Sequence, residues 1–471
     1  MDESIKQKLY SGGMWVVGLK ILALPVGLVL IALLTRMLSA EEMGVYFLVS
    51  SLIEFLVLLS LLGMERSIVR IVSQALALKL PGRAWQAVRD VLSLGVLSTT
   101  IVAVLLAIGV GQFVSEKIFN SALMSELIYY LAIWMVLRGL QSLIAESFRG
   151  INDIRFATLF NGLIPNFLCV TVLALLFWMN VKINLSTTLS IVISACVLNL
   201  LLGYVTLSQG TSKLGSNGSI AVSEILKISW PFYFSAIFLT GLQRSHLWLL
   251  GFYSNAESIA IYGAVSQVVI LFTATLQIVR LVIPAMVAKL YAQKKYNDLE
   301  KLLRSTATIA GVPSIIGLLL IVFFGKTILL HLYGESYANG YSILIILAIA
   351  HIINLLTGVP GILLMMSSKE RVLLIISIFS GSLSFLVSFM LVNRFDYIGV
   401  AIGAGVGIAV HHLLMASYCL IKMNINTFIS LSEICIFKRR IISMLATHKQ
   451  KFILNTSNLG ELPDTSKTVE K

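Results

Sequence analysis

The chain has 471 residues, of which 58% are hydrophobic and only 12% are charged, and its mean hydropathy is +0.93. Soluble domains carry about 25% charged residues, and a single soluble core stops growing near roughly 250–300 residues. This composition therefore excludes a soluble globular protein and indicates a multi-pass membrane protein. The net charge of +13 does not indicate a nucleic-acid partner, because the basic residues gather in one set of loops between apolar segments.

The four cysteines show no CxxC or Cys/His spacing. We predict no disulfide framework, no metal site and no cofactor. The first apolar run is too long for the apolar region of a cleavable signal peptide. We expect it to remain as the first membrane span.

Twelve apolar segments are long enough to cross a membrane, which takes roughly 20 residues. In chain order they are 12–36, 44–64, 90–113, 122–146, 155–178, 184–207, 228–251, 258–283, 305–328, 340–365, 371–392 and 396–422. The runs are continuous rather than alternating, which predicts α-helices instead of the strands of a membrane barrel.

Lys and Arg gather in the loops on the side of the N-terminus. The opposite loops and their margins hold only Arg36, Lys117, Lys182, Lys326 and Arg394. By the positive-inside rule, both termini are predicted to be cytoplasmic. Two of the cytoplasmic loops, 65–89 and 284–304, are long, basic and periodically apolar, which is typical of amphipathic segments at the membrane surface.

The two long loops follow the second and the eighth span, and the sequence ahead of them repeats. Glu41 and Tyr46 recur as Glu257 and Tyr262, each 216 residues later. Because both halves start on the same side, this predicts a parallel repeat of two six-helix lobes around a central cleft. The predicted parts are a first lobe at 1–207, a polar cytoplasmic linker at 208–227, a second lobe at 228–422, and an amphipathic segment with a disordered tail at 423–471.

Ionisable residues inside the spans are candidate functional positions, because each costs roughly 2.5–3.5 kcal/mol at a helix centre on insertion scales. Lys20, Arg138 and Arg244 are the deep cations, and Glu54 is the deep acid. Glu54 is expected either to pair with Lys20 or Arg138, which lowers the cost of burying them, or to couple transport to protons or sodium. Long cations near helix ends can also snorkel to the interface without a function.

His246 and His351 also lie within predicted spans. We treat both as candidates for the cleft or for ion coupling. The structural alternative is a histidine that packs between helices with its ring nitrogens hydrogen-bonded.

Several short motifs resemble those of the O-antigen and capsule flippases, which belong to the multidrug/oligosaccharidyl-lipid/polysaccharide (MOP) exporter superfamily. The motifs are RMLSAEEMGVY at 36–46, LGMERSIVR at 62–70, FRG at 148–150, ISWP at 228–231 and LYGESY at 332–337. The resemblance extends over residues 5–422. Many family members carry an acidic residue in the middle of the seventh span, where this chain has Arg244-Ser245-His246, which argues against cation coupling at that position.

The resemblance implies an alternating-access flippase of the bacterial inner membrane, coupled to an ion gradient. Its substrate would be an undecaprenyl-diphosphate-linked oligosaccharide, a repeat unit of O-antigen, capsule or exopolysaccharide, and its partners a polysaccharide polymerase and chain-length machinery. The deep cations suit that substrate, because arginine binds phosphate bidentately. We expect Lys20, Arg138 and Arg244 to line the cleft and hold the diphosphate. Side chains expected to bond sugar hydroxyls are Asn161, Asn166, Asn199 and Gln243.

Three other functions stay open. A cation-coupled multidrug or toxin antiporter of the same superfamily would need an acidic cleft, whereas the charges within the spans are mainly basic. A lipid II flippase usually has two further C-terminal spans. A membrane glycan polymerase or ligase usually has a large outer loop with acid/base residues, and every outer loop here is short. We therefore predict a transporter rather than an enzyme.

Overall fold

The computed structural model describes residues 3–211 and 222–430, and every regular element within these ranges is helical. Nine helices in the same ranges are long and apolar enough to cross a membrane. The predicted all-α membrane fold is confirmed. The count of twelve spans and the cytoplasmic position of both termini stay predictions, and "outer" and "cytoplasmic" below refer to that predicted orientation.

The N-terminal half contains nine α-helices and three π-helical segments, η1 to η3. They are α1 (Glu3–Met37), α2 (Ala40–Leu61), α3 (Met64–Ala77), α4 (Pro81–Leu105), η1 (Leu106–Val110), η2 (Phe113–Ile118), α5 (Ala122–Glu126), α6 (Ile128–Gly150), α7 (Ile154–Thr158), η3 (Leu159–Leu163), α8 (Ile164–Trp178) and α9 (Leu185–Thr211).

The C-terminal half contains seven α-helices and one 3₁₀ segment, η4. They are α10 (Val222–Tyr253), α11 (Ala256–Val282), α12 (Pro284–Ala292), α13 (Tyr296–Tyr333), η4 (Glu335–Gly340), α14 (Tyr341–Thr357), α15 (Pro360–Met366) and α16 (Glu370–Met423). Helix α16 is interrupted at Asp396, whose φ of 49° and ψ of −132° are not helical. The predicted spans 371–392 and 396–422 are the two arms of this helix.

Local sequence sets the starts of the second helix in each half. Ser39 caps α2 in a capping box, because its side chain accepts from the Glu42 N–H at 3.2 Å while the Glu42 carboxylate accepts from the Ser39 N–H at 3.0 Å. Asn255 caps α11 by accepting from the Ser258 N–H at 2.9 Å. The two caps lie 216 residues apart, which is the separation of the sequence repeat.

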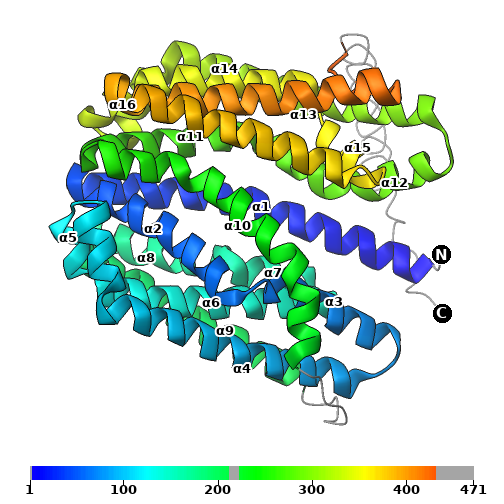
Figure 1. Cartoon of the computed structure of the whole chain (residues 1–471), viewed down its shortest axis with the longest axis horizontal. Coiled ribbons are helices and arrows are strands. Elements are labelled where there is room, and N and C mark those ends of the chain that lie inside the picture. Colours follow the sequence, from blue (N-terminus) through cyan, green and yellow to red (C-terminus); the bar gives the residue numbers. More distant parts are fainter. Residues whose placement is uncertain (1–2, 212–221, 431–471) are drawn as a thin grey trace, which may run out of the picture.

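Helices α2 to α9 form one group and α11 to α16 a second, with α1 and α10 running between them (Figure 1). Helix α1 packs on α8 of the first group and on α11 of the second. Helix α10 packs on α2 and α3 of the first group and on α16 of the second. The N-terminal end of α1 lies at one end of the molecule together with α3 and α12, and α5 lies at the other end (Figure 1).

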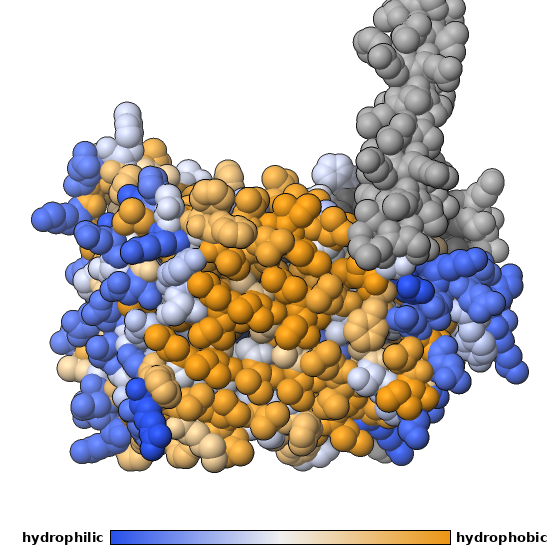
Figure 2. Space-filling model, turned by 90° about the horizontal axis from the view of Figure 1, so that it is seen from above, coloured by the Kyte–Doolittle hydropathy of each residue, from blue (hydrophilic) through white to orange (hydrophobic). Residues whose placement is uncertain are grey.

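A broad hydrophobic belt covers the face seen in Figure 2, and hydrophilic residues flank it at both ends. The helices run across this belt from one hydrophilic end to the other, as expected where lipid replaces water as the solvent. Large exposed apolar side chains on several helices contribute to the lipid-compatible surface, among them Ile108, Trp178, Phe323 and Ile421.

The predicted surface segment 65–89 contains α3, a strongly amphipathic helix. Ile68 and Val72 are fully buried on its apolar face, which packs on α4 and α6, while Arg66 and Arg70 are exposed. The turn from α2 into α3 requires Gly63, because its φ is +79° and a Cβ there would lie 2.8 Å from the Ser229 carbonyl oxygen. The amphipathic pattern of α3 therefore reflects packing on protein.

The predicted linker and tail are described only in part. Helix α9 continues to Thr211 and α10 begins at Val222, so part of the predicted linker is helical, and residues 212–221 lie outside the described ranges. Asn424 ends α16 in the left-handed conformation. Residues 425–430, expected to start an amphipathic helix, instead run along α14, where Ile429 N–H donates to the Leu356 carbonyl at 3.0 Å; residues 431–471 lie outside the described ranges.

Candidate functional site

An ion pair crosses the seam between α2 and α10. Glu54 lies in the middle of α2, Arg244 lies in the outer half of α10, and their carboxylate and guanidinium groups are in direct contact. The side chains are 44% and 36% exposed, so the pair borders an accessible space rather than a sealed core. The expectation that Glu54 pairs with Lys20 or Arg138 is wrong, because α10 brings Arg244 against this face of α2.

The cytoplasmic half of α10 is fastened to the first helix group. The Tyr233 hydroxyl donates to the Leu59 carbonyl of α2 at 3.1 Å. The Ser229 hydroxyl donates to the Ser67 hydroxyl of α3 at 2.9 Å, and both serines are buried. In a membrane interior such bonds are favoured, since the alternative is an unsatisfied polar group in hydrocarbon.

The outer half of α10 is joined to α16 instead. His246 Nε2 lies 2.9 Å from the Ser384 hydroxyl, and that hydroxyl donates to the Gly403 carbonyl at 2.8 Å. His246 therefore connects α10 to both arms of α16. Its predicted role in ion coupling stays a prediction, and this packing contact is the structural alternative.

Arg138 lies on α6 and reaches the π-helical segment η3. Its guanidinium donates to the Asn161 carbonyl at 3.2 Å, and the side-chain amide of Asn199 from α9 donates to the neighbouring Phe160 carbonyl at 3.0 Å. A π segment breaks the regular hydrogen-bond ladder, and these two side chains satisfy carbonyls within it. Asn199 is 1% exposed, and its amide nitrogen is used in this packing contact while its amide oxygen is buried without a hydrogen-bond partner. Arg138 is only half-buried.

The other predicted residues are scattered. Lys20 is exposed on α1, and within the described ranges the structure shows no ion pair for it. His351 on α14 and Asn166 on α8 are half-buried, and Gln243 on α10 is exposed. The structure thus joins Arg244 to Glu54, but it shows no common partner for the three predicted cations.

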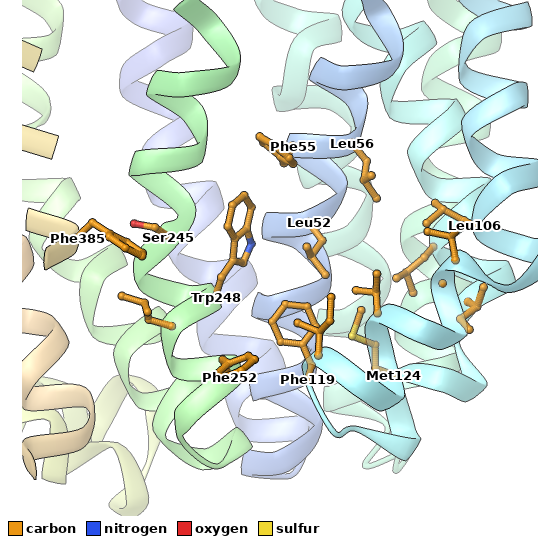
Figure 3. A pocket seen from close by; sticks show the side chains of 17 residues that line it. Leu52, Phe55, Leu56, Leu106, Phe119, Met124, Ser245, Trp248, Phe252 and Phe385 are labelled. Atoms are coloured by element: carbon orange, nitrogen blue, oxygen red, sulfur yellow. The ribbon is translucent and has the colours of Figure 1, made fainter. Parts of the chain in front are cut away.

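An apolar pocket of about 440 Å³ lies in the outer half of the same seam (Figure 3). Helix α2 contributes Leu52, Phe55 and Leu56, and η1, η2, α5 and α6 close the far side. Trp248 of α10 lies between the two helices, and its indole N–H donates to the Ser51 hydroxyl at 3.2 Å. No sequence pattern predicts this pocket, because α2 and α10 are apolar around most of their circumference and neither has a distinct polar face.

At the outer end, α1 and the first helix group are in close contact with the second group. The guanidinium of Arg36, at the end of α1, donates to the Leu332 carbonyl at the end of α13 at 3.1 Å, as cations do at helix C-termini. Gly44 of α2 packs so closely on α11 that a Cβ would lie 1.9 Å from the Ala256 carbonyl oxygen. The outer side of the seam is therefore closed.

Comparison with known proteins identifies the family of the chain. A family model described as "Polysaccharide biosynthesis protein" matches residues 9–290. A search of curated protein sequences finds no significant match.

Solved structures with a similar fold are membrane transporters. One is an inward-facing multidrug-resistance MATE transporter of the MOP superfamily, 12% identical over 88% of this chain and 98% of that chain, with a TM-score of 0.71. A mutant of the MATE transporter VcmN from Vibrio cholerae is 14% identical over 90% and 98%, with a TM-score of 0.62. A MOP-superfamily transporter from Pyrococcus furiosus, whose reversed pocket polarity suggests a different function, is 13% identical over 88% and 95%, with a TM-score of 0.58.

At these identities the likeness establishes the fold. The family model covers more than half of the chain and agrees with the resemblance seen in the sequence motifs. The protein belongs to the polysaccharide biosynthesis family and has the fold of MOP-superfamily transporters.

Proposed function

We propose that the protein moves an undecaprenyl-diphosphate-linked oligosaccharide from the cytoplasmic to the outer leaflet of a bacterial inner membrane. The family match over residues 9–290 carries this proposal. The charges support it: Arg138 and Lys20 have no acidic partner within the described ranges, and Arg244 pairs with the single deep acid. Unneutralised cations inside a membrane suit an anionic ligand such as a diphosphate.

The proposed cycle is alternating access between the two helix groups. The closed outer end, held by Arg36 and the Gly44 contact, corresponds to a state that receives its cargo from the cytoplasmic side. Arg244 then exchanges its Glu54 partner for a phosphate oxygen, so that the diphosphate and the carboxylate compete for one guanidinium. The released carboxylate is the group proposed to bind a coupling ion. No covalent chemistry is required, and a polysaccharide polymerase would take up the product.

The test is a transport assay in proteoliposomes that contain a fluorescent undecaprenyl-diphosphate oligosaccharide. We expect Arg138→Ala and Arg244→Ala to reduce transport at least about tenfold, the effect of losing a charge-assisted phosphate contact of roughly 1.5–3 kcal/mol, and Lys20→Ala to reduce it as well. Arg149→Ala is the matched control, because Arg149 pairs with Glu146 near the cytoplasmic end of α6. Undiminished transport by all three variants would contradict the proposal. Efflux of cationic dyes by the native protein, without lipid transport, would favour the multidrug antiporter.

A further inference from the structure

The apolar pocket in the α2–α10 seam has the chemistry of a hydrocarbon site. Its volume of about 440 Å³ falls within the roughly 300–1,000 Å³ of ligand pockets. Ser245 is its one hydroxyl-bearing lining residue, and that hydroxyl already donates to the Leu242 carbonyl at 2.7 Å. The Trp248 N–H is likewise committed to Ser51. The lining therefore offers no free donor to a sugar or a phosphate, and it suits an alkyl or isoprenoid chain.

A charged group stands at the edge of this pocket. Arg244 lies four residues before the lining residue Trp248 on α10, so the two side chains share one face of the helix, one turn apart. Glu54 lies three residues after Ser51, which accepts from the Trp248 indole N–H, and the Glu54 and Arg244 side chains meet across the seam. A molecule with its chain in the pocket would place an adjacent anion beside the Arg244 guanidinium. Such a ligand is an amphiphile in which a phosphate is joined directly to a long hydrocarbon chain.

The depth of Arg244 distinguishes such a ligand from a resident phospholipid. Arg244 precedes the end of α10 at Tyr253 by nine residues, which is about 13 Å at 1.5 Å per residue. The hydrocarbon core of a bilayer is about 30 Å thick, so Arg244 lies near the middle of the membrane. A resident phospholipid keeps its phosphate at the interface, whereas a lipid in transit carries its phosphate past this depth.

The second seam between the helix groups lacks this combination. Between α1 and α11 there is a smaller pocket of about 110 Å³. Its lining residues are Ala23, Leu24, Gly27, Leu28, Gln267, Ile270 and Leu271, and none is charged. By the 216-residue repeat, Leu28 corresponds to Arg244 and Ile270 to Glu54. Lys20 lies one turn before Ala23 on α1, but among the described residues this seam has no counterpart of the Glu54–Arg244 pair, and its pocket has a quarter of the volume.

We propose that the α2–α10 pocket binds the isoprenoid segment next to the diphosphate of the cargo, so that the hydrocarbon chain passes the protein along this seam. The inference rests on the proposed function and adds the site and the side through which the chain passes. A pocket that binds this segment would give polyprenyl lipids a higher affinity than diacylglycerol lipids.

The test measures binding to the full-length protein in nanodiscs, with farnesyl diphosphate, inorganic pyrophosphate and phosphatidylglycerol as probes. Leu56→Trp fills the pocket and should weaken farnesyl diphosphate binding about tenfold through overpacking, with pyrophosphate binding unchanged. Phe252→Gln changes an exposed lining residue without disturbing the core and should act in the same direction. Ile270→Trp, in the other seam, is the matched control and should leave both affinities unchanged.

Three results would overturn the proposal. They are equal binding of farnesyl diphosphate and pyrophosphate by the native protein, unchanged farnesyl diphosphate binding in both pocket variants, and equally strong competition by phosphatidylglycerol. Its failure is distinguishable from failure of the proposed function. Lipid-linked oligosaccharide transport by the native protein, with full transport by both pocket variants, removes the pocket and keeps the function. If the native protein transports no lipid-linked oligosaccharide, but the pocket variants lose isoprenoid binding, the pocket is kept and the proposed function is removed.

Discussion

Replacing Arg244 with alanine leaves the Glu54 carboxylate without its cation in the middle of α2. An isolated charge at a helix centre costs roughly 2.5–3.5 kcal/mol on insertion scales. The cost here is smaller, because both side chains are more than a third exposed and water or lipid headgroups can reach them. Polar interactions between membrane helices average about 0.6 kcal/mol and reach about 1.7 kcal/mol in double-mutant cycles. We therefore expect a coupling energy of about 1 kcal/mol between Glu54 and Arg244.

The assay is a double-mutant cycle on the free energy of unfolding in mixed micelles, with Glu54→Ala, Arg244→Ala and the double variant. Each single variant should lower the free energy of unfolding. The double variant should lower it by less than the sum of the two single effects, and the difference is the coupling energy. The pair Glu300 and Arg304, one turn apart on α13, provides the control, with a coupling of about 0.3–0.5 kcal/mol expected for an i,i+4 pair. A coupling between Glu54 and Arg244 below that of the control would refute the cross-seam pair.

Two further predictions concern packing. Gly44→Ala should lower the melting temperature and impair closure of the outer end, because its Cβ would lie 1.9 Å from the Ala256 carbonyl oxygen. Gly27→Ala is the control and should leave the melting temperature unchanged, because nothing lies within 4 Å of its Cβ. Thermal-shift measurements on both variants test this prediction. Asn199→Ala should destabilise by about 1–3 kcal/mol, the cost of an unsatisfied buried acceptor, because it strips the donor from the Phe160 carbonyl. Normal stability with impaired cargo binding would instead make Asn199 a ligand-binding residue.

The helices were predictable because their signals are local. Run length located most of the long apolar helices, and the motif around Ser39 recurs around Asn255 as a second helix cap. The fold class followed from composition, since a single soluble core cannot bury so many apolar side chains. Helix ends were less predictable: α4 begins at Pro81 rather than near residue 90, because polar residues extend a helix beyond the membrane without changing its hydropathy signal.

The contacts between helices were not predictable, because they depend on distant residues. Glu54 and Arg244 are 190 positions apart, and the cost of burying a charge marks each as unusual without naming its partner. Asn199 shows the same limit. An amide in an apolar span looks like a ligand-binding group, and its sequence does not reveal that its nitrogen donates to the Phe160 carbonyl in the π-helical segment η3.

Helix α10 links the two helix groups, and this constrains how they can move. In the proposed alternating-access cycle, opening the outer end would separate α2 from the outer half of α10 and break the Glu54–Arg244 pair and the bond from Trp248 to Ser51. The contacts of Tyr233 and its neighbours with α2 and α3 lie in the cytoplasmic half and are not strained by that opening. If the cytoplasmic contacts persist while the outer ones break, the proposed cycle requires α10 to bend between these two sets of contacts.

The polar links contribute only part of the free energy of this step. The polar links that would break at the outer end are the ion pair, the Trp248 bond and the bond from Arg36 to the Leu332 carbonyl, and the packing of α2 on α11 around Gly44 adds to them. At about 0.6 kcal/mol for an average interhelical polar interaction, the polar links amount to about 2 kcal/mol. One elementary charge that moves through a potential of 100 mV supplies about 2.3 kcal/mol. In the proposed cycle, one coupling ion would therefore supply about as much free energy as these three polar links, once Arg244 has exchanged Glu54 for its anionic cargo.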